Sequence, residues 1–546
     1  MIKKITNGAQ TVVSALELAG VNTIFTLSGN HIMPIYNAIF DSNIELIHTR
    51  HEAAAVHMAD AWARLTGKVG IALVTGGPGH ANAVSALYTA SMAETPVVLI
   101  SGHAPLNQLG KGAFQEMAQA AIAAPLTKAS WTCQKIEDLG FDLAKAIRIA
   151  KSGRPGPTHL SLPSDLLEAI SPLNMPLLTS EDFMMNSKAA KSSDIATILS
   201  ALTTAKKPLI LVGPMMHSKV NRKKLVLLEE FLGIPVIGME SPRGIGDPSL
   251  GAFAEVLAES DCILLLGKKL DFTLKFGNTP GIKQECKFLQ IDPEEAEIDR
   301  VKNMLGNRLQ IACVCDTSSA INAILSTNPA KHPSSGTWLR EVSAAVAYRP
   351  SSWKELPPNE GRLHPAKALL PLQEILDSHP DSVLVSDGGE IGQWAQACLN
   401  APNRILNGIA GAIGASLPFA IAARVAKKDV PIIAIMGDGT FGFHSAEIDT
   451  AVRYGLNCVL FVGNDACWNA EYQIQLKDYG KDRAIGCELL PSSYEKVCQA
   501  FGGHGELVTN SENILPAVKR AIASKLPSCL NVMIEGLAAP NIKRMV

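Results

Sequence analysis

The sequence of 546 residues lacks several features that would identify its class at once. Its eleven cysteines include no CxxC pair, and an odd number of cysteines argues against a disulfide framework. No apolar stretch reaches about 18 uninterrupted residues, the length needed to span a bilayer. The 49 basic and 51 acidic residues leave a formal charge of −2, with no extended run of one sign. The sequence therefore offers neither a membrane-spanning helix nor a basic surface for nucleic acid.

The composition is that of a large, well-buried α/β protein, because 47% of the residues are hydrophobic, 18% are charged and only 5% are aromatic. At about 150 residues per domain, the length predicts roughly three or four domains. Residues 1–20 have the pattern of an amphipathic helix, without the apolar core or small-residue cleavage site of a signal peptide. We therefore expect a cytoplasmic protein whose partners are small molecules.

Polar and Pro-rich segments divide the chain into three regions. The first region ends near the polar stretch 186–193, and the second ends in the Pro- and Ser-rich segment 326–360. In each region, short apolar runs typical of strands alternate with longer helical patterns, which predicts parallel sheets covered by helices on both faces. We predict an α/β fold with three doubly wound parallel-sheet domains at residues 1–180, 190–330 and 360–546.

The first and third regions share a pattern of strand, glycine turn, helix and second strand. In the first region the two strands end at Gly76 and Gly102, and in the third at Gly437 and Gly463. The separation along the chain is the same for both pairs of glycines. The equal spacing predicts one βαβ architecture used twice.

Two aspartates follow the paired strands of the third region. If the two spacings are aligned, Asp438 corresponds to Gly77 and Asp465 to Ala104, so only the third region carries an acid at both strand ends. The carboxyl ends of neighbouring parallel strands meet at the crevice where open α/β sheets bind ligands. Carboxylate oxygens suit Mg²⁺, which commonly also binds the phosphates of a ligand.

The residues around Asp438 suit a phosphate group. Gly437 and Gly439 allow the backbone to approach a ligand closely, Thr440 adds a hydroxyl, and the following helix offers free N–H groups. A GDG turn alone is more often a simple helix cap. Together with a second acidic turn at βαβ spacing, it predicts a Mg²⁺-bridged diphosphate.

GDG at Gly437–Gly439, followed one strand–helix–strand unit later by GND at Gly463–Asp465, resembles the thiamine diphosphate motif. The resemblance is to the branch that contains acetolactate synthases, benzaldehyde lyase and oxalyl-CoA decarboxylase/2-hydroxyacyl-CoA lyases. It extends along almost the whole chain. Residues 50–83 resemble the pyrimidine-binding domain, 264–277 and 287–292 the central domain, and 409–418, GDGTFGF and GNDACWNAE the diphosphate-binding domain.

The resemblance implies that Glu52 hydrogen-bonds the aminopyrimidine of thiamine diphosphate and so promotes loss of the C2 proton of the thiazolium. The apolar residues on its predicted helix face, Val56, Ala59 and Ala63, indicate independently that this side chain is buried. An ordinary acid at a helix start is the alternative.

The resemblance also implies further cofactor contacts. Pro78 would contact the cofactor, Gly411 would bind its 4′-amino group through the backbone carbonyl, and Ile413 would support its V shape. Ile413 would equally serve as a core residue.

Gly437, Asp438, Gly439, Thr440 and Asp465 would hold the diphosphate and its metal. Asp438, Asp465 and the backbone of Cys467 match the metal-ligand positions of this branch. The chain departs from the pattern at Asp465, because the branch usually has Asn there, and the added negative charge puts the metal affinity in question.

Several further side chains match positions near the reacting centre. His31 falls on an active-site histidine of benzaldehyde lyase, and Gln115 on a glutamine that faces the reacting centre in both families. We predict that His31 transfers protons and that Gln115 orients the substrate carbonyl. A structural histidine is the alternative.

Trp468 and Glu471 are expected to face the substrate pocket or to pack as a lid. The histidines with weaker claims are His57, His80, His103 and His444.

The resemblance implies an enzyme that uses thiamine diphosphate and Mg²⁺ to make or break a carbon–carbon bond through a C2 carbanion and an enamine. Its substrate would be a 2-oxo acid, a 2-hydroxy ketone or a 2-hydroxyacyl thioester. One alternative is an acetolactate synthase that contains FAD, and another is a nonenzymatic assembly or regulatory subunit of the same fold. A nicotinamide dehydrogenase is disfavoured, because no GxGxxG follows the first strand of any region.

Assembly and a second cofactor are also implied. In this family Glu52 of one subunit meets Asp438 of another, so a homodimer or homotetramer is expected. The central region resembles a domain that holds FAD in acetolactate synthases and ADP in oxalyl-CoA decarboxylase, so either nucleotide is possible there.

Overall fold

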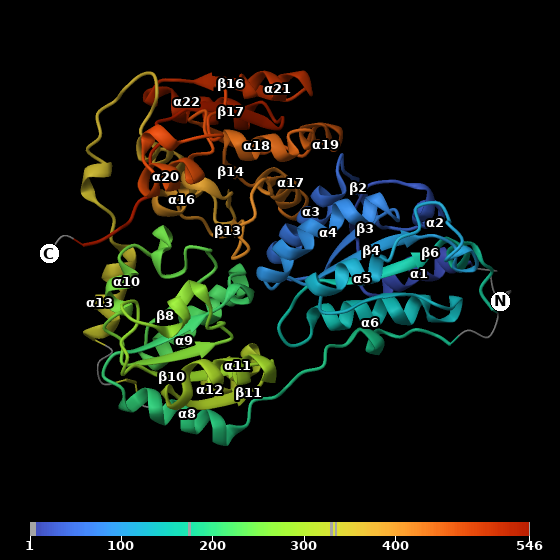
Figure 1. Cartoon of the computed structure of the whole chain (residues 1–546), viewed down its shortest axis with the longest axis horizontal. Helices are drawn as coiled ribbons and strands as arrows, with labels where there is room; N and C mark the ends of the chain where they lie inside the picture. The colour runs from blue at the N-terminus through green and yellow to red at the C-terminus, as the bar shows by residue number, and fades with distance from the viewer. Residues whose placement is uncertain (1–6, 173–175, 328–330, 333–335, 545–546) are drawn as a thin grey trace. The chain divides into compact units, whose positions relative to one another are not determined.

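The computed structural model describes residues 7–172, 176–327, 331–332 and 336–544. Within these ranges the strands form three sheets, and the neighbouring strands of each sheet run parallel (Figure 1). The predicted α/β fold class is confirmed.

Contact density divides the chain into two compact units. The first contains Met1–Asn186, Leu417–Lys428 and His444–Asn457, and the second contains Ser187–Ser416, Asp429–Phe443 and Cys458–Val546. The boundaries proposed for three domains stay a prediction.

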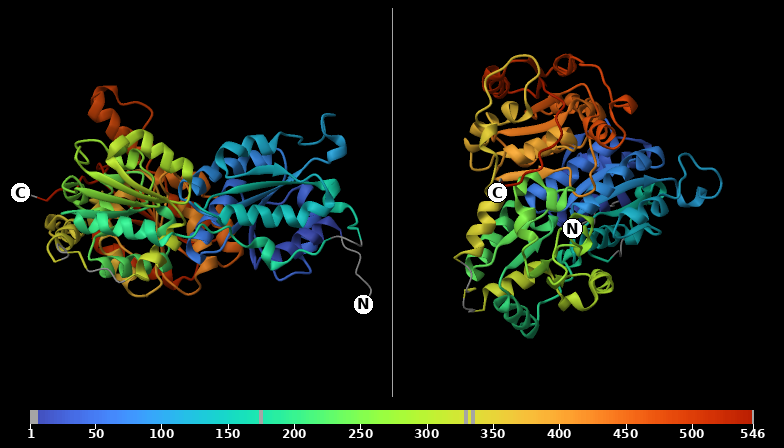
Figure 2. Two further views of the ribbon diagram at one scale, coloured as in Figure 1. Left: turned by 90° about the horizontal axis from the view of Figure 1, so that it is seen from below. Right: turned by 60° about the vertical axis from the view of Figure 1, so that its left-hand side comes forward.

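The first sheet has the strand order β2-β1-β3-β4-β6-β5. Its strands are β1 (Thr23–Thr26), β2 (Glu45–His48), β3 (Gly70–Val74), β4 (Val97–His103), β5 (Ser130–Thr132) and β6 (Thr158–Pro163). The helices of this part of the chain are α1 (Gly8–Leu18), α2 (Met33–Ile39), α3 (Glu52–Thr66), α4 (Pro78–Met92), α5 (Gln119–Ala123), α6 (Leu139–Lys151) and α7 (Ser164–Glu168). Helices α1 and α6 lie on one face of the sheet, and α3 and α4 cover the other (Figure 1, Figure 2). Apolar side chains of α1 and α6 belong to the core on their face.

The central sheet has the order β11-β10-β9-β7-β8. Its strands are β7 (Pro208–Val212), β8 (Val236–Gly238), β9 (Cys262–Leu266), β10 (Lys287–Asp292) and β11 (Leu309–Val314), and its helices are α8 (Ser192–Thr204), α9 (Lys219–Leu232), α10 (Phe253–Leu257), α11 (Glu295–Leu305), α12 (Thr317–Leu325) and α13 (Trp338–Ala347). Leu264 and Leu266 pack toward α8, α9 and α12, whereas Ile263 and Leu265 pack toward α10 and α13. Burial on both faces explains why this strand is a continuous apolar run.

The third sheet has the order β13-β12-β14-β15-β17-β16. Its strands are β12 (Val383–Ser386), β13 (Asn403–Leu406), β14 (Ile432–Gly437), β15 (Val459–Asn464), β16 (His504–Val508) and β17 (Ser528–Met533). The helices of this part of the chain are α14 (Pro365–Leu369), α15 (Leu372–Asp377), α16 (Gly389–Cys398), α17 (Ser416–Ala426), α18 (Asp438–His444), α19 (Glu447–Arg453), α20 (Asn469–Asp478), α21 (Tyr494–Ala500) and α22 (Ile514–Ala523). Relative to its first strand, this order is the same as that of the first sheet.

The first and third sheets differ by one residue in the spacing between paired residues of their corresponding strands. Val74 of β3 pairs with Ser101 of β4, and Gly437 of β14 pairs with Gly463 of β15. The partners in the first sheet are therefore one position further apart along the chain than those in the third. The equal glycine spacing in the sequence does not reflect an equal strand register.

The alignment of the two copies changes accordingly. The residues that follow the first strands, Leu27 and Asp387, donate their N–H groups to Leu73 and Ile435. When the copies are aligned through these bonds, Asp438 corresponds to Gly76. The correspondence with Gly77 was wrong, because counting glycines cannot detect one extra residue between the strands.

The order in which strands are added to the third sheet changes sides at β12. Strand β13 lies on one side of β12, and the next strand along the chain, β14, lies on the other. Loops that leave the carboxyl ends of such strands diverge and open a crevice. The same reversal occurs between β1 and β3 of the first sheet.

A buried ion pair joins the central and third sheets within the second unit. Glu240, which follows β8, accepts hydrogen bonds from Nε and Nη2 of Arg404 on β13, at 2.9 and 2.6 Å. His217 Nδ1 lies 3.1 Å from the same carboxylate oxygen. Burial alone would raise the pKa of Glu240, but the neighbouring His217 and Arg404 outweigh burial and lower it.

Glu240→Gln should lower the free energy of unfolding by about 3 kcal/mol, because removing one partner leaves a buried charge without compensation. Denaturant unfolding followed by circular dichroism measures the effect. The matched control is Glu374→Gln, because the Glu374–Lys519 pair is more than half exposed. We expect the control to change stability by less than about 0.5 kcal/mol. Equal effects of the two substitutions would show that the buried pair contributes no more than a surface pair.

Candidate functional site

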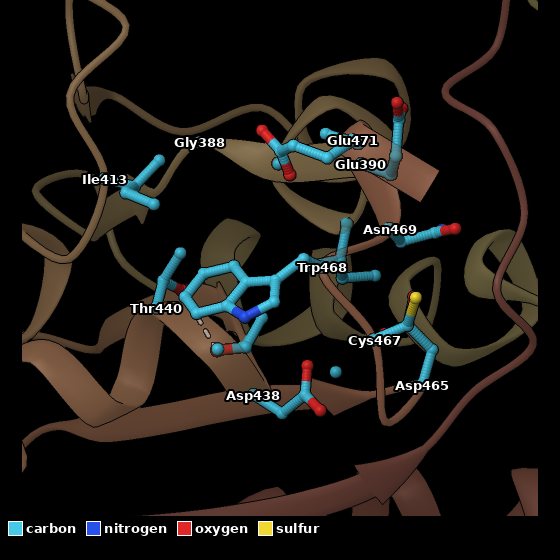
Figure 3. A pocket seen from close by; sticks show the side chains of 16 residues that line it. Gly388, Glu390, Ile413, Asp438, Thr440, Asp465, Cys467, Trp468, Asn469 and Glu471 are labelled. Carbon is cyan, nitrogen blue, oxygen red and sulfur yellow. Dashed lines mark hydrogen bonds between the residues drawn. The ribbon is translucent and has the colours of Figure 1, made fainter. Parts of the chain in front are cut away.

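A pocket opens at the carboxyl ends of β12, β14 and β15 in the second unit (Figure 3). It is lined by residues 388–391, Ile413, 437–440, Gly463, Asp465 and 467–471. Most of the residues predicted for the diphosphate and metal site are among them, namely Ile413, Gly437, Asp438, Gly439, Thr440, Asp465 and Cys467. Gly411 is not one of these lining residues. It has a φ of +66° and donates its N–H to the carbonyl of Gly408 at 3.1 Å.

The two aspartates of this pocket have raised pKa values, because they are removed from water and Asp438 repels Asp465. Burial raises the pKa of Asp438 to about 6. Burial and then repulsion from Asp438 raise the pKa of Asp465 to about 7. Oδ2 of Asp438 is buried and has no hydrogen-bond partner among the described residues. A divalent cation would relieve both the repulsion and the missing partner, so this donor set fits Mg²⁺.

Cys467 can contribute to such a site only through its backbone. Burial raises the pKa of its thiol to about 12, so the sulfur stays protonated near neutral pH. A protonated thiol is a poor ligand for a hard cation.

A buried aspartate that sequence reasoning missed fixes the loop that carries Ile413. Asp387 is 1% exposed and accepts hydrogen bonds from the N–H groups of Gly388, Gly414 and Ser416, at 2.7, 3.0 and 3.1 Å. A Cβ at Gly388 would lie 2.6 Å from Cγ2 of Ile413, so the loop packs directly on this glycine. The signal in the sequence was an acid between a strand and two glycines.

Trp468 lies across the pocket and against the turn Gly437–Gly439. A Cβ at Gly439 would lie 2.6 Å from Cζ3 of the indole, so the ring packs on the backbone of this turn. The ring also makes an edge contact with Phe443, with 6.3 Å between the ring centroids. Figure 3 shows the indole beside Thr440 and above Asp438. Both Trp468 and Glu471 line the pocket.

Glu390 lines the pocket and is a second residue that sequence reasoning missed. It is 8% exposed and accepts the N–H of Ala539 at 2.5 Å. The nearby Leu537 accepts a hydrogen bond from Asn469 Nδ2 at 3.2 Å. The segment that follows the last strand is thus attached to two pocket residues, a contact between distant parts of the chain that no local pattern reveals.

The remaining predicted residues lie in the first unit, where Glu52 is the first residue of α3. Its neighbour His51 caps the helix, with Nδ1 accepting the N–H of Ala53 at 3.1 Å. Glu52 is 9% exposed, and its Oε2 accepts a hydrogen bond from Nδ2 of Asn82 at 3.0 Å. The residues on the same face of this helix, Val56, Ala59 and Ala63, are all buried as well.

His31 and Gln115 lie near the carboxyl ends of β1 and β3. His31, in the short 3₁₀ helix Asn30–Ile32, is 3% exposed, and its Nδ1 lies 3.3 Å from Oγ1 of Thr75. Its ring stacks on Phe114 with 5.9 Å between centroids, and burial lowers its pKa. Gln115 has a φ of +56° and packs on Gly77. A Cβ built on Gly77 would lie 2.7 Å from the Cβ of Gln115.

The glycine turn beside Gln115 is held by a residue that was not predicted. Gln119 accepts the N–H of Gly77 at 2.8 Å and donates to the carbonyl of Gly102 and the hydroxyl of Ser161, at 3.0 and 2.9 Å. Pro78 then begins α4 and is exposed. The turn is therefore fixed from the side of the sheet, while Pro78 remains accessible.

The four histidines with weaker claims are all buried or largely buried. Burial lowers the pKa of His57 and His444 to about 3 and that of His80 to about 4, so these rings are neutral near pH 7. The ring nitrogens of His103 face the carbonyls of Ala104 and Met117 at 2.9 and 3.3 Å.

The turn after β9 of the central sheet is covered by the chain's own side chains. A Cβ at Gly267 would lie 2.4 Å from Cε of Met215 and 2.5 Å from Oγ1 of Thr317. A bound FAD or ADP stays a prediction. No helix in the part of the chain that the structure describes is long and apolar enough to cross a membrane.

Three family models match the chain. Residues 6–122 match the N-terminal TPP binding domain of thiamine pyrophosphate enzymes, 195–324 their central domain and 387–532 their C-terminal TPP binding domain. The chain is 30% identical to a probable acetolactate synthase of Mycobacterium bovis over 542 residues, which is 97% of this chain and 96% of that protein. It is 30% identical to 2-hydroxyacyl-CoA lyase 2 of Caenorhabditis elegans, over 92% of this chain and 85% of that protein, and 28% identical to the human protein of that name, over 94% and 87%.

Asp438→Ala should weaken Mg²⁺-dependent binding of thiamine diphosphate by about 100-fold, since an interaction with a charged group contributes up to roughly 3 kcal/mol. Isothermal titration calorimetry with and without Mg²⁺ measures this. Asp465→Asn should stay within about tenfold of wild type, because asparagine keeps an oxygen ligand and removes the repulsion. Unchanged binding by the Asp438 variant would place the metal elsewhere.

Proposed function

Since the chain belongs to the thiamine pyrophosphate enzymes, in the branch of acetolactate synthases and 2-hydroxyacyl-CoA lyases, we propose that it makes or breaks a carbon–carbon bond next to a carbonyl group. The proposed substrate is a 2-oxo acid, a 2-hydroxy ketone or a 2-hydroxyacyl thioester. The observation that carries the proposal is the pocket lined by the buried Asp438, the partly buried Asp465 and the glycine turn at the start of α18.

The residues of the second unit supply the elements of a Mg²⁺ and diphosphate site. Asp438, Asp465 and the backbone carbonyl of Cys467 would hold the cation. The glycine turn and the first N–H groups of α18, with the hydroxyl of Thr440, would bind the diphosphate. Ile413 would support the middle of the cofactor. When bound, thiamine diphosphate supplies an electron sink for the reacting carbon.

The residues of the first unit would handle protons and orient the substrate. Glu52 would hydrogen-bond the pyrimidine ring through a carboxyl that is buried at the start of α3. Burial lowers the pKa of His31, which favours the neutral ring that would accept a proton. Gln115 would orient the substrate carbonyl with its amide. Pro78, exposed at the start of α4, and the carbonyl of Gly411 would contact the cofactor.

We further propose a cytoplasmic homodimer or homotetramer in which Glu52 of one subunit serves the diphosphate site of another. An acetolactate synthase that converts two pyruvates to acetolactate is a second candidate, supported by the similarity to the mycobacterial protein. A substrate panel of pyruvate, oxalyl-CoA, 2-hydroxyacyl-CoAs and benzoin, read by product mass spectrometry, separates these candidates. A tightly bound flavin with acetolactate as the product would favour the second one.

Glu52→Gln should reduce exchange of the C2 proton of bound thiamine diphosphate to a rate near that of the free cofactor, because the amide cannot transfer a proton. Acid-quenched NMR in D₂O measures the rate. Glu45→Gln, an exposed carboxyl on β2, is the control and should exchange like wild type. Fast exchange in the Glu52 variant would remove this residue from the mechanism.

His31→Ala should lower kcat on the best substrate of the panel by about 100-fold, the lower limit of general acid–base catalysis. Cofactor affinity should stay within about twofold. His379→Ala removes a histidine whose Nδ1 accepts the N–H of Asp381, far along the chain, and should leave kcat unchanged. An unaltered kcat in the His31 variant would assign this ring to packing against Phe114.

A further inference from the structure

The backbone of residues 48–51, which leads from β2 to Glu52, is bound by the side chains of α19 and the residue that follows it. The N–H of His48 donates to Oη of Tyr454 at 2.9 Å, and Nη2 of Arg453 donates to the carbonyl of His48 at 2.7 Å. All of these residues belong to the first unit. These side chains satisfy backbone N–H and carbonyl groups at and just after the end of β2.

Glu447 makes the last and most buried of these contacts. It is the first residue of α19 and is 1% exposed. Its Oε1 accepts the N–H groups of Arg50 and His51, at 2.9 and 3.0 Å. Its Oε2 accepts the hydroxyl of Thr450 at 2.7 Å. Both carboxylate oxygens are therefore engaged, one of them by the two residues that precede Glu52.

These contacts fix the residue that begins α3. His51 is extended, with φ −146° and ψ 141°, and its ring caps the helix. Its N–H is held by Glu447, and its carbonyl accepts the hydroxyl of Thr49 at 3.0 Å. With both backbone groups of His51 held, the Cα of the next residue, Glu52, has little freedom.

We infer that Glu447 is a positioning residue that holds Glu52 in place through the backbone of Arg50 and His51. The inference rests on the proposed role of Glu52. Burial raises the pKa of Glu447, whereas the hydrogen bonds that it accepts from Thr450, Arg50 and His51 favour the ionised carboxyl and oppose that rise in the pKa. The N–H groups require an oxygen at this position, and glutamine supplies one as well as glutamate does.

The test compares Glu447→Ala with Glu447→Gln. The alanine variant loses the acceptor, and we expect C2 proton exchange at saturating thiamine diphosphate and Mg²⁺ to fall by about 100-fold, the effect of a displacement of about 1 Å. The glutamine variant keeps the acceptor and should stay within about threefold of wild type. Amide hydrogen exchange of the cofactor-free protein gives a second readout, in which residues 49–53 should exchange faster in the alanine variant only.

A matched control removes a similar contact far from Glu52. Asp261 accepts the N–H groups of Lys206 and Lys207, both at 2.8 Å, in the central region. Asp261→Ala should lower the melting temperature without changing C2 exchange. If Glu447→Ala does not fold, Glu447→Asp, which is shorter by one methylene, should show the same slowed C2 exchange.

The outcomes separate the inference from the proposed function. Wild-type C2 exchange in the alanine variant, or a glutamine variant as slow as the alanine variant, would overturn the positioning role. The second result would instead indicate that the ionised carboxyl itself is needed. Wild-type protein that does not accelerate C2 exchange above the free cofactor would overturn the proposed function.

Discussion

Buried carboxyls that accept backbone N–H groups hold the loops of this protein in position. Asp387 binds three N–H groups around the loop of Ile413, and Glu447 binds two in front of Glu52. Each such carboxyl is costly to bury unless its oxygens are satisfied, and the backbone provides the partners. In each unit the loop is therefore held by hydrogen bonds near the strand ends, where loops are otherwise the most mobile part of a fold.

Asp438 departs from this pattern in an informative way. Asp438 is as buried as Asp387 and Glu447, yet one of its oxygens has no hydrogen-bond partner in the described part of the chain. A second carboxyl nearby raises the energy further. Negative charge without a partner is thus concentrated at one point of the pocket, as expected of a site whose binding energy comes from a cation and a phosphate.

Much of this architecture could be predicted from the sequence, because its determinants are local. Continuous apolar runs such as Ile432–Met436 predicted buried parallel strands, and the acidic turns at βαβ spacing predicted which strand ends would share a pocket. Asp387, Glu390, Gln119 and Glu447 were missed because their roles depend on contacts between residues that are distant in the sequence, such as Arg50 and Glu447. The one-residue register difference was missed because a glycine marks the end of a strand only approximately.

The contact of Trp468 with Gly439 has an optical consequence. The indole is the tryptophan that lines the pocket, and it packs on the turn that the diphosphate would approach. Its emission will respond to charge and polarity within a few ångströms of the turn. Because the chain has six tryptophans, the change in emission on ligand binding, rather than the total emission, is the signal that we expect from Trp468, and it requires no attached label.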